Sequence, residues 1–160
     1  MKNRFYILLL VVALFSCEKE NRIIDANTVL VEQVWSQDNV LEYKLSIDND
    51  SIEYDLALNI RNGLDYPFRN IFFLYSIEDE KGNLIFADQS ELQLFDKLGK
   101  PLGSNERFLG ISFGDLYYSS NSFKKYKFPK VGDYKIKIVQ NLRNQPILDG
   151  VMAVGVKVSF

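Results

Sequence analysis

The chain has 160 residues, of which 47% are hydrophobic, 25% charged and 14% aromatic, as is typical of a folded globular protein. Nineteen basic and 21 acidic side chains give a net charge of −2, and such a mildly acidic chain is a poor binder of nucleic acid. There is no histidine, and the single cysteine is Cys17. Histidine-based catalysis, histidine-ligated metal sites and internal disulfides are therefore excluded.

The first residues predict a secretory signal peptide. Lys2 and Arg4 precede an unbroken hydrophobic stretch from Phe5 to Phe15. At about 1.5 Å per residue this stretch spans only about half of a ~30 Å hydrocarbon core, which disfavours a permanent membrane-spanning helix. We therefore expect residues 1–16 to be removed as a signal peptide.

The next residues predict a lipid anchor. Leu14-Phe15-Ser16-Cys17 resembles the lipobox of bacterial lipoproteins, in which Cys17 would become the first mature residue and carry the lipid. The alternative is an ordinary signal peptide followed by an incidental cysteine. We favour lipidation because the only cysteine stands where lipidation needs it. Acyl chains contribute about 0.8 kcal/mol per buried CH₂, so two or more chains anchor a protein stably. We expect residues 17–35 to be the lipidated cysteine and a tether.

Residues 36–160 predict one domain in which strand periodicity dominates. Apolar and polar residues alternate over Leu41–Ile47 and again over Ile52–Ile60, and the polar turn Asp48–Ser51 joins them as a hairpin. Ile71–Ile77 is apolar on both faces except at Ser76, which predicts a central strand covered on two sides.

The rest of the domain completes an all-β pattern. Further strands are expected from Leu84 to Phe86, resuming around Leu92 to Phe95, then over Tyr134–Ile138 and Val154–Phe160. Asn27–Trp35 predicts either a helical turn or an extended tether segment. Residues 96–122, rich in glycine and weakly periodic, are expected to be mostly loop. The predicted fold is a single antiparallel β-sandwich of six to eight strands.

Two stretches of the domain carry specific motifs, Asn59-Ile60-Arg61-Asn62 and Tyr66-Pro67-Phe68-Arg69-Asn70. They resemble the N-x-R-N and Y-P-F-x-N elements of the GldH family of gliding-motility lipoproteins. Its other elements are matched by Gly114-Asp115-Leu116-Tyr117, Phe128-Pro129 with Gly132 and Tyr134, Gln140-Asn141-Leu142-Arg143, Gly150-Val151 and Val154-Gly155.

This resemblance implies a noncatalytic part in gliding over surfaces, in assembling or stabilising the motility machinery and the secretion system linked to it. The expected partners are the membrane, through the lipid anchor, and other gliding-motility envelope proteins. No cofactor, metal, nucleic acid or small-molecule substrate is expected. The expected location is the cell envelope, at the outer membrane. An acidic stretch beside the cysteine resembles a surface-export signal of some gliding bacteria, but a solvated tether is favoured, so the membrane face stays open.

The matched residues also have physical interpretations. Pro67 predicts a fixed bend between two strands, with Tyr66 and Phe68 as core anchors. Gly132 and Gly150 stand where turns need permissive dihedral angles. The candidate partner-binding residues are Arg61, Tyr117, Tyr118, Gln140 and Arg143. For Arg143 a structural role, capping loop carbonyls, is favoured over binding a partner carboxylate.

Three short patterns suggest a catalytic, a calcium-binding or a glycosylation site, and the first two are incomplete. Ser112 lies in a G-x-S-x-G match, but that motif requires a histidine base. Asp48, Asp50 and Glu53 lack the spacing of a calcium loop. Ser51 lies in a short pattern that resembles an O-glycosylation acceptor.

Two features leave alternatives open. Six lysines lie between Lys124 and Lys137. The favoured interpretation is that they cover the solvent-facing sides of strands. The alternative is that they bind an acidic protein partner or anionic lipid headgroups. A carbohydrate-binding module is the rival function, and it would need Trp35, Tyr117 and Tyr118 to form an exposed aromatic platform.

Overall fold

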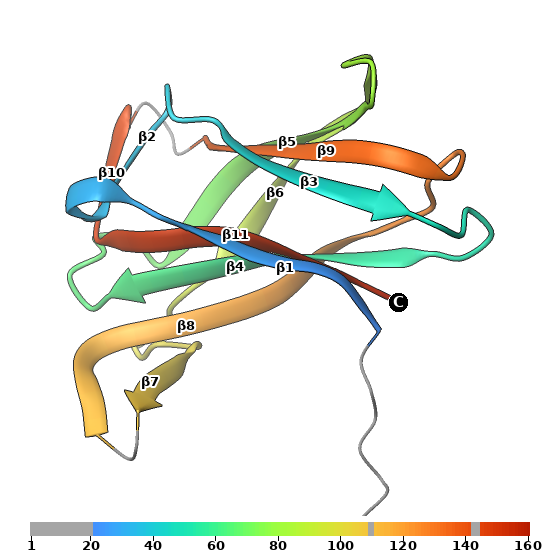
Figure 1. Cartoon of the computed structure of the whole chain (residues 1–160). Coiled ribbons are helices and arrows are strands. Elements are labelled where there is room, and N and C mark those ends of the chain that lie inside the picture. The colour runs from blue at the N-terminus through green and yellow to red at the C-terminus, as the bar shows by residue number, and fades with distance from the viewer. Residues whose placement is uncertain (1–20, 109–110, 142–144) are drawn as a thin grey trace, which may run out of the picture.

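The computed structural model describes residues 21–108, 111–141 and 145–160, with side chains except at 106–108 and 111–115. Its described residues form two antiparallel sheets packed face to face, with a small two-stranded sheet at one end (Figure 1). The predicted all-β sandwich is thus confirmed. Cys17, Arg143 and the expected signal peptide lie outside the described residues.

The larger sheet has the strand order β1-β11-β4-β8-β7 and the smaller one β3-β9-β5-β6. The larger sheet comprises β1 (Arg22–Val29), β11 (Val151–Ser159), β4 (Tyr54–Gly63), β8 (Ile111–Tyr126) and β7 (Ser104–Phe108). The smaller sheet comprises β3 (Leu41–Ile47), β9 (Gly132–Gln140), β5 (Asn70–Asp79) and β6 (Leu84–Gln93). The two-stranded sheet pairs β2 (Val34–Ser36) with β10 (Ile147–Asp149), and a 3₁₀ turn, η2 (Val31–Gln33), precedes β2.

The core lies between the two large sheets, as alternation requires. On β4, Leu56, Leu58 and Ile60 are fully buried and stand opposite the fully buried valines of β11. The aromatic residues that share the parity of the aliphatics are all buried, as expected: Tyr43, Tyr54, Phe73, Tyr75 and Tyr134. Since strand alternation sends successive side chains to opposite faces, the remaining positions form the two outer faces.

The described residues contain eleven strands rather than six to eight, and the loop prediction for residues 96–122 is wrong. Most of that stretch is β7 and β8. Strand β8 has no alternation to detect, because Ser119, Ser120, Asn121 and Ser122 place polar side chains on both faces. A register shift opposite Leu56/Ala57 then changes the parity.

The tether predicted over residues 17–35 is also wrong from Arg22 onward. Strand β1 pairs with β11 along the edge of the larger sheet, and Trp35 is fully buried. The described domain therefore begins at Arg22. Strand β5 does occupy a central position between β9 and β6, but its outer face is not fully covered, since Leu74 is 41% exposed.

Both ends of the described chain lie at the same end of the sandwich. The amide of Phe160 donates to the carbonyl of Asn21 at 3.1 Å (Figure 1). The turns after β3, β5 and β8 lie there too, because the strands run antiparallel. We call this the proximal end. The opposite end, the distal end, carries the β4–β5 turn, η2, the β2–β10 sheet and the loop of residues 94–103.

Gly150 is the residue whose replacement tests the packing of the distal end. Its φ is +76°, and a Cβ there would lie 2.9 Å from the backbone N and Cα of Tyr66. We expect Gly150→Ala to lower the free energy of unfolding by about 2–4 kcal/mol, because dihedral strain adds to overlap with backbone atoms. Gly99→Ala is the matched control, since its φ is +80° with no atom within 4 Å. Equal urea-unfolding midpoints for the two variants would contradict this account.

Candidate docking site

Arg61 and Tyr118 come together on the outer face of the larger sheet. They are cross-strand neighbours on β4 and β8, and the Arg61 guanidinium lies 5.7 Å from the centroid of the Tyr118 ring. A cation–π contact of this kind fixes both side chains. The same row continues through Ala153 of β11 to Val29 of β1.

Tyr117 does not join this pair. It stands opposite Asn62, one position along from Arg61, so its side chain leaves from the other face of the strand. Trp35 is also absent from the surface, because it is fully buried and its indole N–H donates to the carbonyl of Asn39 at 3.1 Å. The three aromatic residues needed for a carbohydrate platform therefore do not share a face.

Gln140 has an internal role at the end of β9. It is only 2% exposed, and its side-chain nitrogen donates to the carbonyl of Gln145 at 2.9 Å. This hydrogen bond ties the strand end to the segment that leads into β10. Gln140 is therefore too buried to bind a partner directly, although the sequence placed it among the candidates.

The Tyr66-Pro67-Phe68 bend lies between β4 and β5. Tyr66 is buried, its hydroxyl donates to the carbonyl of Asn70 at 2.9 Å, and burial raises the pKa of the phenol. Its ring contacts that of Phe68 at a centroid distance of 5.9 Å. Gly150 packs against the Tyr66 backbone, so the bend and the start of β11 hold each other in place.

Two other glycines of the motifs, Gly132 and Gly155, are required by the backbone for different reasons. Gly132 has a φ of +142° where the chain enters β9. Gly155 allows close approach of a neighbouring strand, since a Cβ there would lie 2.3 Å from the carbonyl oxygen of Ala26. Neither residue presents a functional group, so their contribution to any docking site is structural.

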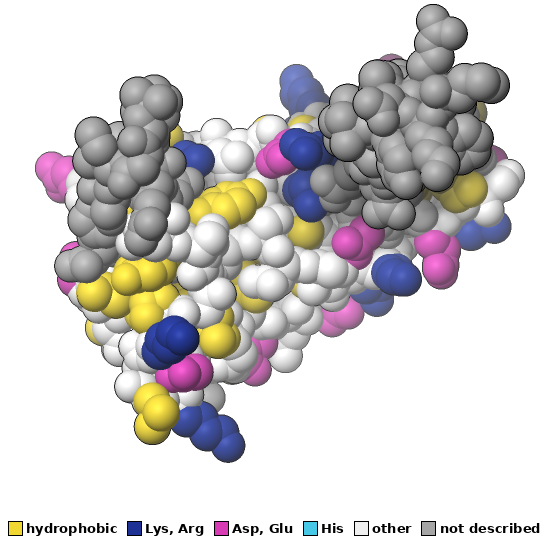
Figure 2. All heavy atoms as spheres, turned by 90° about the horizontal axis from the view of Figure 1, so that it is seen from below, with side chains coloured by type: hydrophobic (Ala, Val, Ile, Leu, Met, Phe, Trp, Pro, Cys, Tyr) yellow, Lys and Arg dark blue, Asp and Glu magenta, His cyan; other side chains and the backbone are white. Residues whose placement is uncertain are grey.

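Large hydrophobic side chains are exposed mostly at the distal end. Of the twelve that are exposed among the described residues, seven belong to distal segments: Val29, Val31, Val40, Leu64, Leu98, Leu102 and Ile147. Figure 2 shows hydrophobic side chains gathered on the left of the face seen from below, with charges of both signs at the lower left and across the right. Contiguous exposed apolar surface commonly marks an interaction site.

The 3₁₀ turn η2 exposes Val31 and contains two residues with a strained backbone conformation. Glu32 and Gln33 have φ values of 55° and 60°, a left-handed conformation that costs a non-glycine residue roughly 1–2 kcal/mol. Val31, next to them, is 82% exposed. A hydrogen bond from the amide of Leu30 to the carbonyl of Met152 at 2.9 Å fixes the turn on one side. Such strain is typical of functional segments.

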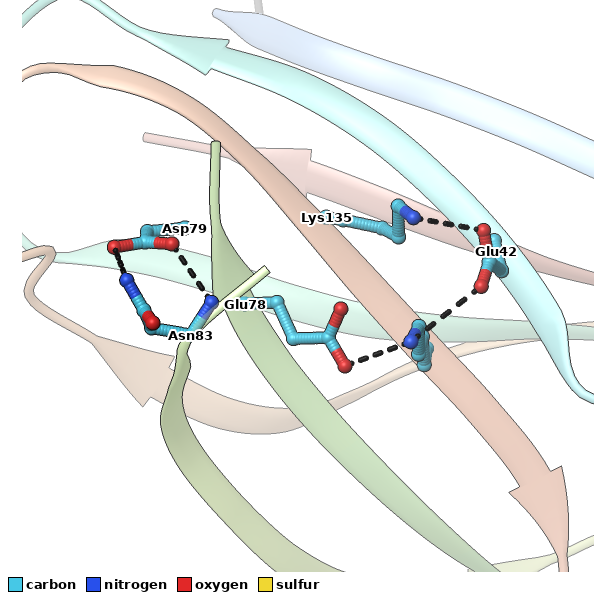
Figure 3. Close-up of polar contacts among 6 residues, drawn as sticks. Glu42, Glu78, Asp79, Asn83 and Lys135 are labelled. Carbon is cyan, nitrogen blue, oxygen red and sulfur yellow. Dashed lines mark hydrogen bonds and ion pairs between the residues drawn. The ribbon is translucent and has the colours of Figure 1, made fainter. Parts of the chain in front are cut away.

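The outer face of the smaller sheet carries a charge network instead (Figure 3). Glu42 lies 3.0 Å from the Lys135 nitrogen and 3.6 Å from that of Lys137, and Lys137 lies 2.7 Å from Glu78. The hydrogen bond with Lys135 lowers the pKa of Glu42, and that with Glu78 raises the pKa of Lys137. These lysines, and Lys124 over the Phe86 ring, are engaged within the domain.

This network predicts how stability depends on pH. Because the pKa of Glu42 is lowered in the folded state, its contribution is present above the ordinary value of 4.5 and is lost as the pH falls through the folded value. The contribution of Lys137 is present below 10.5 and is lost as the pH rises through its raised value. We expect urea-unfolding midpoints to fall more steeply in acid for the wild type than for Glu42→Gln. Equal acid slopes would contradict this expectation.

A hollow at the proximal end is lined by carboxylates and amines together, including Asp48, Asp133, Lys44 and Lys135. No cluster of three or more potential metal ligands of the Asp, Glu, Cys or His types occurs in the part of the chain that the structure describes. Within that same part, no helix is long and apolar enough to cross a membrane.

The exposed distal residues are the part of the candidate site that sequence reasoning missed. Val31, Leu64 and Ile147 lie in turns or beside them, where alternation does not indicate the direction of a side chain. An aliphatic residue in a polar turn is a weak signal, because singly exposed aliphatics are common.

Comparison with known proteins gives a consistent picture. A model of the GldH lipoprotein family matches residues 22–158. The chain is 32% identical over 154 residues to a gliding motility lipoprotein GldH homolog of Christiangramia forsetii, covering 94% of this chain and 89% of that protein. It is also 32% identical over 153 residues to the gliding motility lipoprotein GldH of Flavobacterium johnsoniae, covering 96% and 89%.

Among solved structures, a dimeric latent PorU from Porphyromonas gingivalis overlaps 91% of this chain and 13% of that chain. The sequence identity is 12% and the TM-score is 0.31, which is too low to indicate a shared fold or function.

Proposed function

Because this chain belongs to the GldH lipoprotein family, we propose that it is a lipid-anchored protein of the cell envelope that gliding motility requires. The observation that carries the proposal is the extent of the match. Both relatives, named as gliding motility lipoproteins, are covered over 89% of their length, so the similarity spans the whole folded domain.

The anchor is the lipidated side chain of Cys17. Residues 1–16 act as the signal peptide, and only residues 18–21 separate the cysteine from β1. This tether is much shorter than one that runs to residue 35. The acyl chains hold the domain at the outer membrane, and a rigid sandwich follows the anchor almost directly.

The domain acts without catalysis. Gln140 and Tyr66 are buried and hydrogen-bond within the domain. On the smaller sheet, Glu42 and Glu78 are paired with Lys135 and Lys137. The remaining chemistry is that of surfaces. The protein then assembles or stabilises the motility machinery through contacts of its exposed loops and strand edges with other envelope proteins.

Deletion of the gene tests this function. Colonies of the deletion strain are expected not to spread, and single cells not to glide, while a plasmid copy of the full chain restores both. Normal gliding in the deletion strain would remove the proposed function.

A further inference from the structure

Three exposed aliphatic side chains at the distal end lie on segments that converge on residues 147–152. Val31, Leu64 and Ile147 are 82%, 45% and 52% exposed. We call these three residues the distal patch. They come from η2, the β4–β5 turn and β10, which are far apart in the sequence.

Hydrogen bonds hold these segments in place. The amide of Gly63, next to Leu64, donates to the carbonyl of Gly150 at 3.1 Å. The amide of Leu30, next to Val31, donates to that of Met152 at 2.9 Å. Strand β10, which carries Ile147, pairs with β2 directly after η2. The patch therefore has a rigid base, which lowers the entropic cost of binding a partner.

Each aliphatic residue of the distal patch has a carboxylate beside it in the sequence. Glu32 follows Val31, Asp65 follows Leu64, and Asp149 lies two positions after Ile147. All three carboxylates belong to exposed residues. These six positions are thus apolar and acidic, and their complement is a surface that carries basic and apolar side chains.

The distal patch could be covered by the protein's own lipid, by a second copy of the chain or by a different protein. The position of the anchor bears on this choice, which rests on the proposed function. Residues 17 to 22 reach at most about 18 Å, whereas the eight residues of β1 span about 26 Å between the two ends of the sheet. The peptide tether alone therefore does not bring Cys17 to the distal patch. A second copy would set Glu32, Asp65 and Asp149 against the same carboxylates, and like charges disfavour that pairing.

We propose that the distal patch, Val31, Leu64 and Ile147 with Glu32, Asp65 and Asp149, docks a different envelope protein through a basic and apolar surface. The Arg61–Tyr118 pair lies on the row of the larger sheet that ends at Val29, close to this end, and supplies two residue types that often dominate interfaces.

Gliding of cells with altered patches tests the proposal. The deletion strain receives full-length copies with Val31→Ser, Glu32→Gln and Asp149→Asn, or with Val131→Ser, Glu80→Gln and Asp48→Asn at the proximal end. The second set is a matched control, since it removes one exposed aliphatic side chain and two exposed carboxylates. With equal amounts of membrane-bound protein, the distal variant is expected not to glide and the control to glide normally.

Photocrosslinking identifies what covers the patch. A photoreactive residue at position 31 of the full chain is expected to give a discrete protein adduct in living cells. The yield is expected to fall about tenfold or more with Glu32→Gln and Asp149→Asn, because both changes remove a carboxylate that faces the basic partner. A tenfold fall corresponds to about 1.4 kcal/mol of binding free energy. An adduct of twice the chain mass, an adduct with lipid alone, or normal gliding of the distal variant would overturn the proposal. If the deletion strain itself glides, the proposed function fails instead.

Discussion

A Cys17→Ala copy of the protein is expected to leave cells as unable to glide as cells that lack the gene. Only a thiol at this position can carry the lipid, and no second cysteine in the chain can replace it. Loss of the acyl chains removes about 0.8 kcal/mol for each buried CH₂, which is enough to release the domain from the membrane. Membrane fractionation is expected to show the Cys17→Ala variant either in the soluble fraction or as a precursor whose signal peptide is not cleaved.

Ser16→Ala is the matched control for this experiment. It keeps a small residue directly before Cys17, so processing and gliding are expected to be normal. A Cys17→Ala protein that stays in the membrane fraction and supports gliding would show that the anchor is dispensable.

Phe128→Ala is expected to destabilise the domain by about 3–5 kcal/mol, the usual cost of removing a buried aromatic ring. Phe128 is 1% exposed, and its ring lies 5.5 Å from that of Tyr54, 4.9 Å from Tyr126 and 4.7 Å from Tyr134. Domains of this size are stable by about 5–15 kcal/mol in total, so much of the folded population would be lost.

Urea unfolding of the full chain measures this effect, and Phe128→Leu is the control. Leucine keeps most of the apolar volume, so the cost of Phe128→Leu is expected to stay below about 1.5 kcal/mol. A Phe128→Ala variant with the wild-type midpoint would contradict the packing described here. The result also bears on the family element formed by Phe128-Pro129 with Gly132 and Tyr134. Phe128 contacts the Tyr134 ring, and the Tyr134 hydroxyl donates to the carbonyl of Lys130 at 2.7 Å.

The fold was predictable where one face of a strand is apolar and the other is not. Strands β3, β4, β9 and β11 follow from alternation, since each packs one row of side chains into the core. Strand β8 was not predictable, because serines and an asparagine occupy both faces and a register shift changes the parity. Strand β1 was missed because Ile24, Ala26 and Thr28 give too weak an alternation to separate a strand from a tether.

The candidate site was predictable only in part. Arg61 and Tyr118 were named from the sequence, but their contact depends on the pairing of β4 with β8, which periodicity could not indicate. Tyr117 was grouped with them although it lies on the opposite face. The distal patch comes from segments far apart in the sequence, held by hydrogen bonds to residues 147–152, and no local pattern could reveal it.

The most direct test of the central claim is the intact mass of the protein extracted from its own membranes. The expected species is a chain that begins at Cys17 and carries acyl chains on that residue. A soluble chain whose Cys17 thiol is free and unmodified would contradict the claim that the domain works by being held at a membrane.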